Sequence, residues 1–248
     1  WNFKTFLDAA KKMTIYRADG KTVQTYGVGT WNYALFMFAN GGKGLSEKNG
    51  KLYASVDQKP EMGGLQLLHD LVAANAFYTG DSYIGFGRRR VAMHLEQPAN
   101  AVGNYDYYNN MEDEIGIVPL PMANDGKYYA PKSAGGMIVP RNAKNPLGAV
   151  AFAYEMAKFD NNRFFNSTLD FDLMYRRMSI SDEDLALYLD YRKKAVPLMS
   201  YMESLSGWWD GGYRDKFWNT IVVDKKKPAE AVASMKSVLE SCISRTTS

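Results

Sequence analysis

The fold prediction depends most on residues 26–42, which read Tyr-Gly-Val-Gly-Thr-Trp-Asn-Tyr-Ala-Leu-Phe-Met-Phe-Ala-Asn-Gly-Gly. Tyr26–Gly29 favours a short strand or loop. Trp31–Phe38 predicts a strongly apolar helix, and Asn40 with the two glycines after it would end that helix. The N-terminus of this helix is a candidate binding edge.

Strands and helices alternate on both sides of this stretch. Before it, apolar residues at helical spacing predict an amphipathic helix over 2–13. After it, the patterns predict helices at 60–74, 98–108, 145–158, 209–223 and after Pro228, and strands at 51–56, 91–95, 115–119 and 137–140. Because helices alone follow about residue 158, the fold class is α/β with a helical C-terminal part.

Composition indicates an ordinary globular chain. Its 248 residues are 46% hydrophobic and 23% charged, enough for one large core or two modest ones. Lysine and arginine number 30 against 27 acidic residues, a balance that does not favour nucleic acid as a partner. No window reaches the roughly 18 consecutive apolar residues of a membrane span. Trp1 is neither an initiator methionine nor part of a signal peptide, so we expect the chain to begin within a longer protein.

Catalytic and metal-binding patterns are scarce. The two histidines, His69 and His94, do not form a metal-binding motif, and Cys242 lies on an apolar helical stripe, so we expect neither a metal nor a cofactor. Three acidic clusters keep a two-carboxylate glycosidase open as an alternative: 112–114, Asp170 with Asp172, and 182–184. The third suits the first turn of a helix, where negative side chains are stabilising.

Aromatic residues are abundant, with five tryptophans and seventeen tyrosines. Trp208 and Trp209 precede Asp210 and Arg214, and Trp31 precedes Asn32. Flat apolar rings beside hydrogen-bonding groups suit a sugar, which has apolar C–H faces and hydroxyl edges. Core packing is the alternative for each tryptophan.

The order of several segments resembles a known family. The series is Trp1-Asn-Phe-Lys-Thr-Phe-Leu-Asp-Ala-Ala-Lys-Lys-Met, then 31–42, then Phe86-Gly-Arg-Arg-Arg-Val-Ala-Met, then Ile115-Gly-Ile-Val-Pro-Leu-Pro, then Gly135-Gly-Met-Ile-Val-Pro. It is similar to the extracellular solute-binding proteins of ABC transporters, family 1, the type that includes maltose-binding protein. The resemblance implies a periplasmic-binding-protein type II fold, mainly its C-terminal lobe. Part of the first lobe would be missing.

The resemblance also implies domain boundaries and a site. Residues 1–121 and 165–248 would form the second lobe, and 122–164 would cross back to the incomplete first lobe. Ligand-binding residues would be Trp31, Asn32, Glu96, Asn100, Gly135, Gly136, Trp208, Trp209, Asp210 and Arg214. Where the family often has Gly-Pro-Trp, this chain has Gln97-Pro-Ala99, which leaves the identity of the solute open.

The function implied is that of a non-enzymatic receptor. It would bind a sugar or oligosaccharide in a cleft between lobes and deliver it to an ABC transporter permease outside the cytoplasm. A lipid anchor preceding the chain would be its only link to the membrane. The alternatives are a carbohydrate-active enzyme that uses a carboxylate pair and a protein-interaction domain.

Overall fold

Three parallel strands form the centre of the fold. The computed structural model describes residues 1–96, 113–131, 139, 141–160, 180–198, 200, 202, 205–208 and 211–247. β2 (Val23–Gly29) lies between β5 (Phe77–Tyr78) and β6 (Val91–His94), and both run parallel to it. β1 (Ile15–Tyr16) adds an antiparallel pair at the start of β2. Residues 26–29, expected to be a short strand or loop, are the end of β2, and the strand predicted at 91–95 is confirmed.

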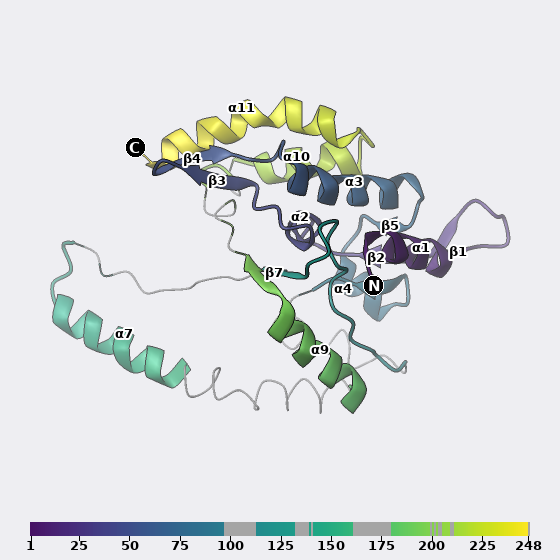
Figure 1. The fold of residues 1–248 in the computed structure, drawn as a ribbon, viewed down its shortest axis with the longest axis horizontal. Coiled ribbons are helices and arrows are strands. Elements are labelled where there is room, and N and C mark those ends of the chain that lie inside the picture. The colour runs from purple at the N-terminus through teal and green to yellow at the C-terminus, as the bar shows by residue number, and fades with distance from the viewer. Residues whose placement is uncertain are drawn as a thin grey trace.

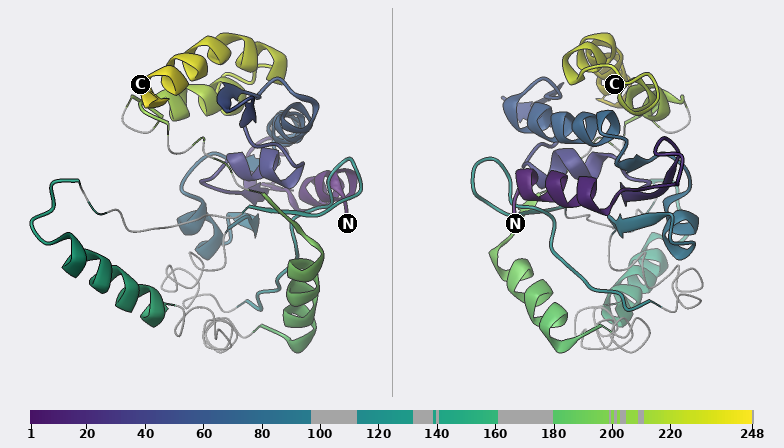
Figure 2. Two further views of the ribbon diagram at one scale, coloured as in Figure 1. Left: turned by 60° about the vertical axis from the view of Figure 1, so that its left-hand side comes forward. Right: turned by 90° about the vertical axis from the view of Figure 1, so that its right-hand side faces the viewer.

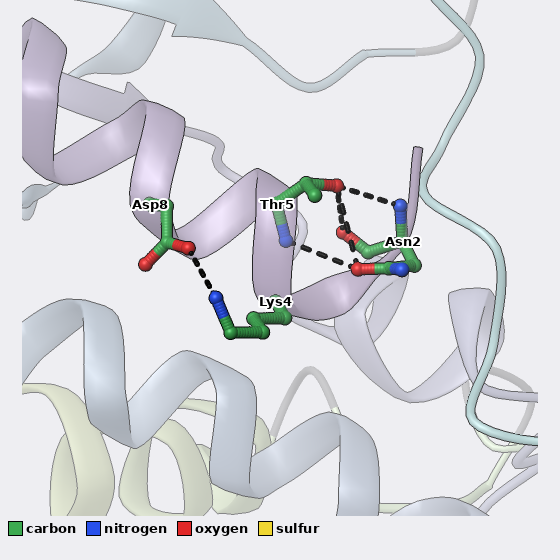
Figure 3. A network of polar contacts seen from close by, with 4 residues as sticks. All are labelled: Asn2, Lys4, Thr5 and Asp8. Carbon is green, nitrogen blue, oxygen red and sulfur yellow. Dashed lines mark hydrogen bonds and ion pairs between the residues drawn. The ribbon is translucent and has the colours of Figure 1, made fainter.

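The first helix packs directly on β2. α1 (Phe3–Met13) begins at a capping box, in which Asn2 and Thr5 bond each other's backbone amide (Figure 3). Phe6 and Ala10 are buried on its inner face. A Cβ at Gly27 would lie 1.9 Å from the carbonyl oxygen of Ala10, so this close approach requires glycine. The predicted helix over 2–13 is confirmed.

The predicted helix at 31–38 begins three residues later than expected, as α2 (Ala34–Ala39). Asn32 explains the difference, because its side chain accepts a hydrogen bond from Ala34 N at 3.1 Å while its own N–H donates to Thr30 Oγ at 3.0 Å. Such local bonds compete with helical ones. Residues 30–33 therefore form a polar turn between β2 and α2.

A second layer covers the sheet and α2. It contains α3 (Lys59–Ala73), the hairpin of β3 (Leu45–Lys48) and β4 (Lys51–Ala54), α10 (Tyr213–Val222) and α11 (Pro228–Thr247), as Figure 2 shows. The hydrophobic core combines buried residues from 3–95 with others from 198–243. The helices predicted at 60–74 and after Pro228 are confirmed. The helix predicted at 209–223 begins later, at Tyr213.

The remaining elements lie below or beside these layers (Figure 1). α4 (Ser82–Gly87) precedes β6, and β7 (Tyr129–Pro131) pairs in parallel with β8 (Val196–Leu198). α7 (Pro146–Asp160) and α9 (Asp182–Lys194) follow in the chain.

Two of the predicted strands have other outcomes. Residues 115–119 are not in a strand. The Trp1 indole donates a hydrogen bond to the carbonyl oxygen of Pro119 at 2.9 Å. That prediction was wrong, because an apolar run forms a strand only where a neighbouring strand can pair with it. The predicted helix at 98–108, and the strand at 137–140 apart from Val139, lie outside the described residues.

Candidate functional site

Two of the predicted site residues meet at the carboxyl ends of parallel strands. Gly29 of β2 pairs with His94 of β6, and these are the last residues of their strands. Trp31 and Glu96 each follow two residues later, so the register places them side by side. Ligands in α/β folds bind outside the carboxyl ends of the strands. This edge is therefore the candidate site.

Trp31 is held at both its side chain and its main chain. Its indole Nε1 donates a hydrogen bond to Glu96 Oε2. Arg214, in the first turn of α10, donates from Nη2 to the Trp31 carbonyl oxygen at 2.9 Å, and its guanidinium carbon lies 6.0 Å from the centroid of the indole ring. Trp31 stays partly exposed. The structure thus brings together three predicted residues from distant parts of the chain.

Tyr83 completes the cluster, and sequence analysis did not select it. Its hydroxyl donates to Glu96 Oε2, the same oxygen that accepts from Trp31. Next to it, Ser82 Oγ and His94 Nε2 lie at a hydrogen-bonding distance of 3.0 Å. The contact between Ser82 and His94 places the first turn of α4 beside the end of β6. No element was predicted at 82–87, so the sequence patterns gave no signal for Tyr83.

His94 is neutral at physiological pH in this arrangement. Burial lowers the pKa of His94 from its ordinary value of 6.5 to about 4, and the nearby carboxylates of Glu96 and Asp81 only partly oppose that shift. The imidazole ring also packs edge-on against Tyr83, with centroids 4.8 Å apart. His94 therefore packs beside Tyr83 as an uncharged ring.

Asn32 and Trp208 have structural roles in the described chain. Asn32 is 6% exposed and shapes the turn before α2. Trp208 is 1% exposed and packs in the core against Phe217, with ring centroids 6.4 Å apart. The prediction of Trp208 as an exposed stacking surface is corrected to core packing. The reason is that α10 and α11 supply an apolar interior for its ring.

The other predicted contacts lie outside the described residues: Asn100, Gly135, Gly136, Trp209 and Asp210. Within the described ranges, no group of three or more His, Cys, Asp or Glu side chains could hold a metal ion. None of the helices in those ranges is long and apolar enough to cross a membrane. The cluster at 182–184 occupies the first turn of α9, as its helix-start pattern predicted.

Comparison with known proteins identifies the fold. No family model matches the sequence, and no curated protein matches it. The maltose/maltodextrin-binding domain MalE of Bdellovibrio bacteriovorus, solved with maltotriose, superposes with a TM-score of 0.60 at 14% identity and covers 99% of this chain. A solute-binding protein of Thermotoga lettingae, solved with α-D-tagatose, gives 0.62 at 16% identity over 98%. UgpB of Mycobacterium tuberculosis, solved with glycerophosphocholine, gives 0.61 at 12% over 99%.

These matches define a class of fold. The chain has the α/β fold of ABC-transporter solute-binding proteins, the periplasmic-binding-protein type II fold that the family resemblance implied. It spans 66%, 64% and 63% of the length of these three proteins respectively. Each of the three is named as a binding protein or was solved with a small molecule.

Proposed function

We propose that the chain is the larger part of the substrate-binding component of an ABC transporter, and that it binds a sugar or oligosaccharide. One observation carries the proposal: a partly exposed indole, Trp31, is fixed by Glu96 and Arg214 at the carboxyl ends of two parallel strands. A rigid aromatic face beside charged hydrogen-bonding groups matches the apolar face and polar edge of a pyranose ring. Support also comes from the ligands named for two of the similar structures, maltotriose and α-D-tagatose.

The proposed protein works outside the cytoplasm and passes its ligand to a membrane permease. A lipid anchor preceding these residues would hold it at the membrane. Its role is binding without chemical conversion, so incubation with oligosaccharides should release no new reducing ends. Release of reducing ends would favour the carboxylate-pair enzyme instead.

The proposed lobe boundaries are those of the sequence analysis. Residues 1–121 and 165–248 form one lobe, and 122–164 belong to another lobe that these 248 residues do not complete. Support comes from α7, where Leu147, Val150, Phe152 and Tyr154 are 54–81% exposed. Four large apolar side chains on one exposed helix are what a segment would show if its packing partners lay in the other lobe. Gly135, Gly136, Asn100, Trp209 and Asp210 remain proposed contacts, reaching the ligand from both lobes.

The test is a thermal-shift screen of the full-length protein against maltotriose, α-D-tagatose, other mono- and oligosaccharides, and glycerophosphocholine. A ligand that binds only the folded state raises the melting temperature, and the rise grows with the logarithm of its concentration relative to its Kd. Trp31→Ala should then lower the affinity for the best sugar by about tenfold or more in calorimetry, because the stacking face is lost.

The matched control is Trp1→Ala. Trp1 is also exposed, at 40%, but its ring packs edge-on against Phe6 and its indole donates to the Pro119 carbonyl oxygen. Its removal should leave the sugar affinity unchanged. If no sugar shifts the melting temperature, or if glycerophosphocholine alone does, sugar binding is excluded as the function.

A further inference from the structure

The cluster at the strand ends depends on one carboxylate oxygen that serves two aromatic residues. Glu96 Oε2 accepts from the Trp31 indole and from the Tyr83 hydroxyl. Resting on the proposed function, we propose that Tyr83 is a positioning residue: acting through Glu96, it sets the plane in which the Trp31 indole meets the ligand. Tyr83 itself need not touch the ligand.

The physical argument begins with the freedom of the carboxylate. A glutamate side chain has three rotatable bonds, so a single hydrogen bond to Trp31 would let both groups move together. A second donor on a different element removes that freedom, because the carboxylate then bridges two fixed points. Hydrogen bonds to an ionised acceptor are also stronger than neutral ones. Tyr83 is the second fixed point.

α4 is itself well anchored, which makes Tyr83 a rigid support. Asp81 caps the helix, accepting from Ile84 N at 3.0 Å. Ser82 bonds His94 on β6, and the Tyr83 ring packs on the same histidine. Ser82 and Tyr83, adjacent residues of α4, therefore both contact His94 at the end of β6, and the hydroxyl of Tyr83 is held in place.

The main chain of Trp31 is fixed independently by Arg214 from α10. With its carbonyl and its indole N–H both engaged, Trp31 has little rotational freedom left. A stacking face that is rigid before binding costs less entropy when a ligand arrives. Loss of the Tyr83 hydroxyl should therefore weaken binding without removing any ligand contact.

The test compares Tyr83→Phe with Tyr129→Phe in the full-length protein. Both changes remove a phenol that donates to a carboxylate, since Tyr129 donates to Asp125 Oδ2 at 2.7 Å. Tyr129 lies against Gly41, beyond the other end of α2 from Trp31. The first readout is the indole N–H resonance of Trp31 in ligand-free protein, assigned through its loss in Trp31→Phe.

Tyr83→Phe should shift the Trp31 resonance. It should also lower the affinity for the best sugar of the screen by about fivefold. Tyr129→Phe should do neither. In a Glu96→Ala background, Tyr83→Phe should have no further effect on affinity, because its action passes through Glu96.

An unmoved Trp31 resonance in Tyr83→Phe would overturn the proposal, and so would a moved resonance with unchanged affinity. A further loss of affinity in the Glu96→Ala background would also overturn it, because Tyr83 would then act directly. If no sugar binds the wild-type protein, the proposed function fails, while the ligand-free resonance still decides whether Tyr83 orients the indole.

Discussion

Two helices of equal length, α3 and α7, differ in how far their apolar side chains are buried. Each has 15 residues and each is rich in apolar side chains. In α3 the leucines at 65, 67, 68 and 71 are at most 5% exposed, whereas in α7 Leu147 is 81% exposed and Phe152 is 63% exposed. Apolar composition alone therefore does not bury a helix.

The difference comes from what surrounds each helix. α3 packs among α1, α2, α10 and α11, so its apolar face meets other apolar faces on several sides. α7 stands apart from these layers in Figure 1 and in the left view of Figure 2. Its described contacts include a local ion pair between Lys158 and Glu155 at 3.0 Å. Burial is a property of the assembly of elements, and the following changes test it.

A matched pair of leucine truncations gives the largest expected effect. Leu68→Ala should lower the free energy of unfolding by about 3 kcal/mol, because it leaves a cavity in a site with no exposure. Leu147→Ala in the same 248-residue chain should change it by less than about 0.5 kcal/mol. Urea unfolding measures both. Equal losses in the two variants would mean that α7 is packed as tightly as α3.

Acid should destabilise the protein through His94, at the end of β6. The folded pKa of His94 is about 4 against an ordinary value of 6.5, so the unfolded chain binds more protons between those values. Stability should therefore fall as pH drops from 6.5 towards 4, by about 2 kcal/mol after allowance for partial exposure. His94→Gln should flatten the curve in that window. If the urea midpoints of wild type and variant change equally from pH 6.5 to 4, the pH dependence does not come from His94.

Replacing the buried carboxylate of Glu61, in the first turn of α3, by an amide should lower the free energy of unfolding by a smaller amount. Glu61 is 3% exposed, and its Oε1 accepts from Lys43 N, Gly44 N and Ser55 Oγ at 3.0, 3.2 and 2.8 Å. Glu61→Gln should cost about 1–2 kcal/mol, because charge-assisted bonds become neutral ones. The control is Glu230→Gln, at the corresponding exposed position in the first turn of α11. Chemical denaturation should separate the two variants, and an equal cost would remove the special role of Glu61.

The smallest effect is expected at the start of α7. Asn145 caps this helix, with its side-chain oxygen accepting from Gly148 N at 2.9 Å. Asn145→Ala should weaken the first turns of α7 by about 1 kcal/mol or less. Because α7 is little buried, the loss should speed amide hydrogen exchange within α7 and leave exchange in α3 unchanged. Faster exchange in α3 as well would show that the two helices unfold together.

Local sequence patterns predicted helices whose start signals lie within or next to the helix itself. The helix over 2–13, the proline at the start of α11 and the acidic first turn of α9 were predicted from the sequence, because helix signals involve residues within a few turns. The start of α2 was missed since the competing bonds of Asn32 needed the geometry of the turn. The pairing of β7 with β8 joins residues more than 60 positions apart, and no local pattern signals it.

The candidate site likewise combines residues that the sequence indicated with one that only the tertiary structure revealed. Trp31, Glu96 and Arg214 could be selected from residue type and from the family resemblance, because their chemistry is visible in the sequence. Which tryptophan faces solvent was decided by packing, since Trp208 has the same side chain as Trp31 and lies in the core. Tyr83 joined the site only through a hydrogen bond across two elements.

The sequence by itself determined the α/β class, most of the helices and the candidate residues, because periodicity, capping and residue chemistry act over short distances along the chain. The tertiary structure decided which apolar surfaces are covered and which polar groups share a partner. Those outcomes depend on the register of parallel strands and on contacts such as that between Arg214 and Trp31, which are 183 residues apart.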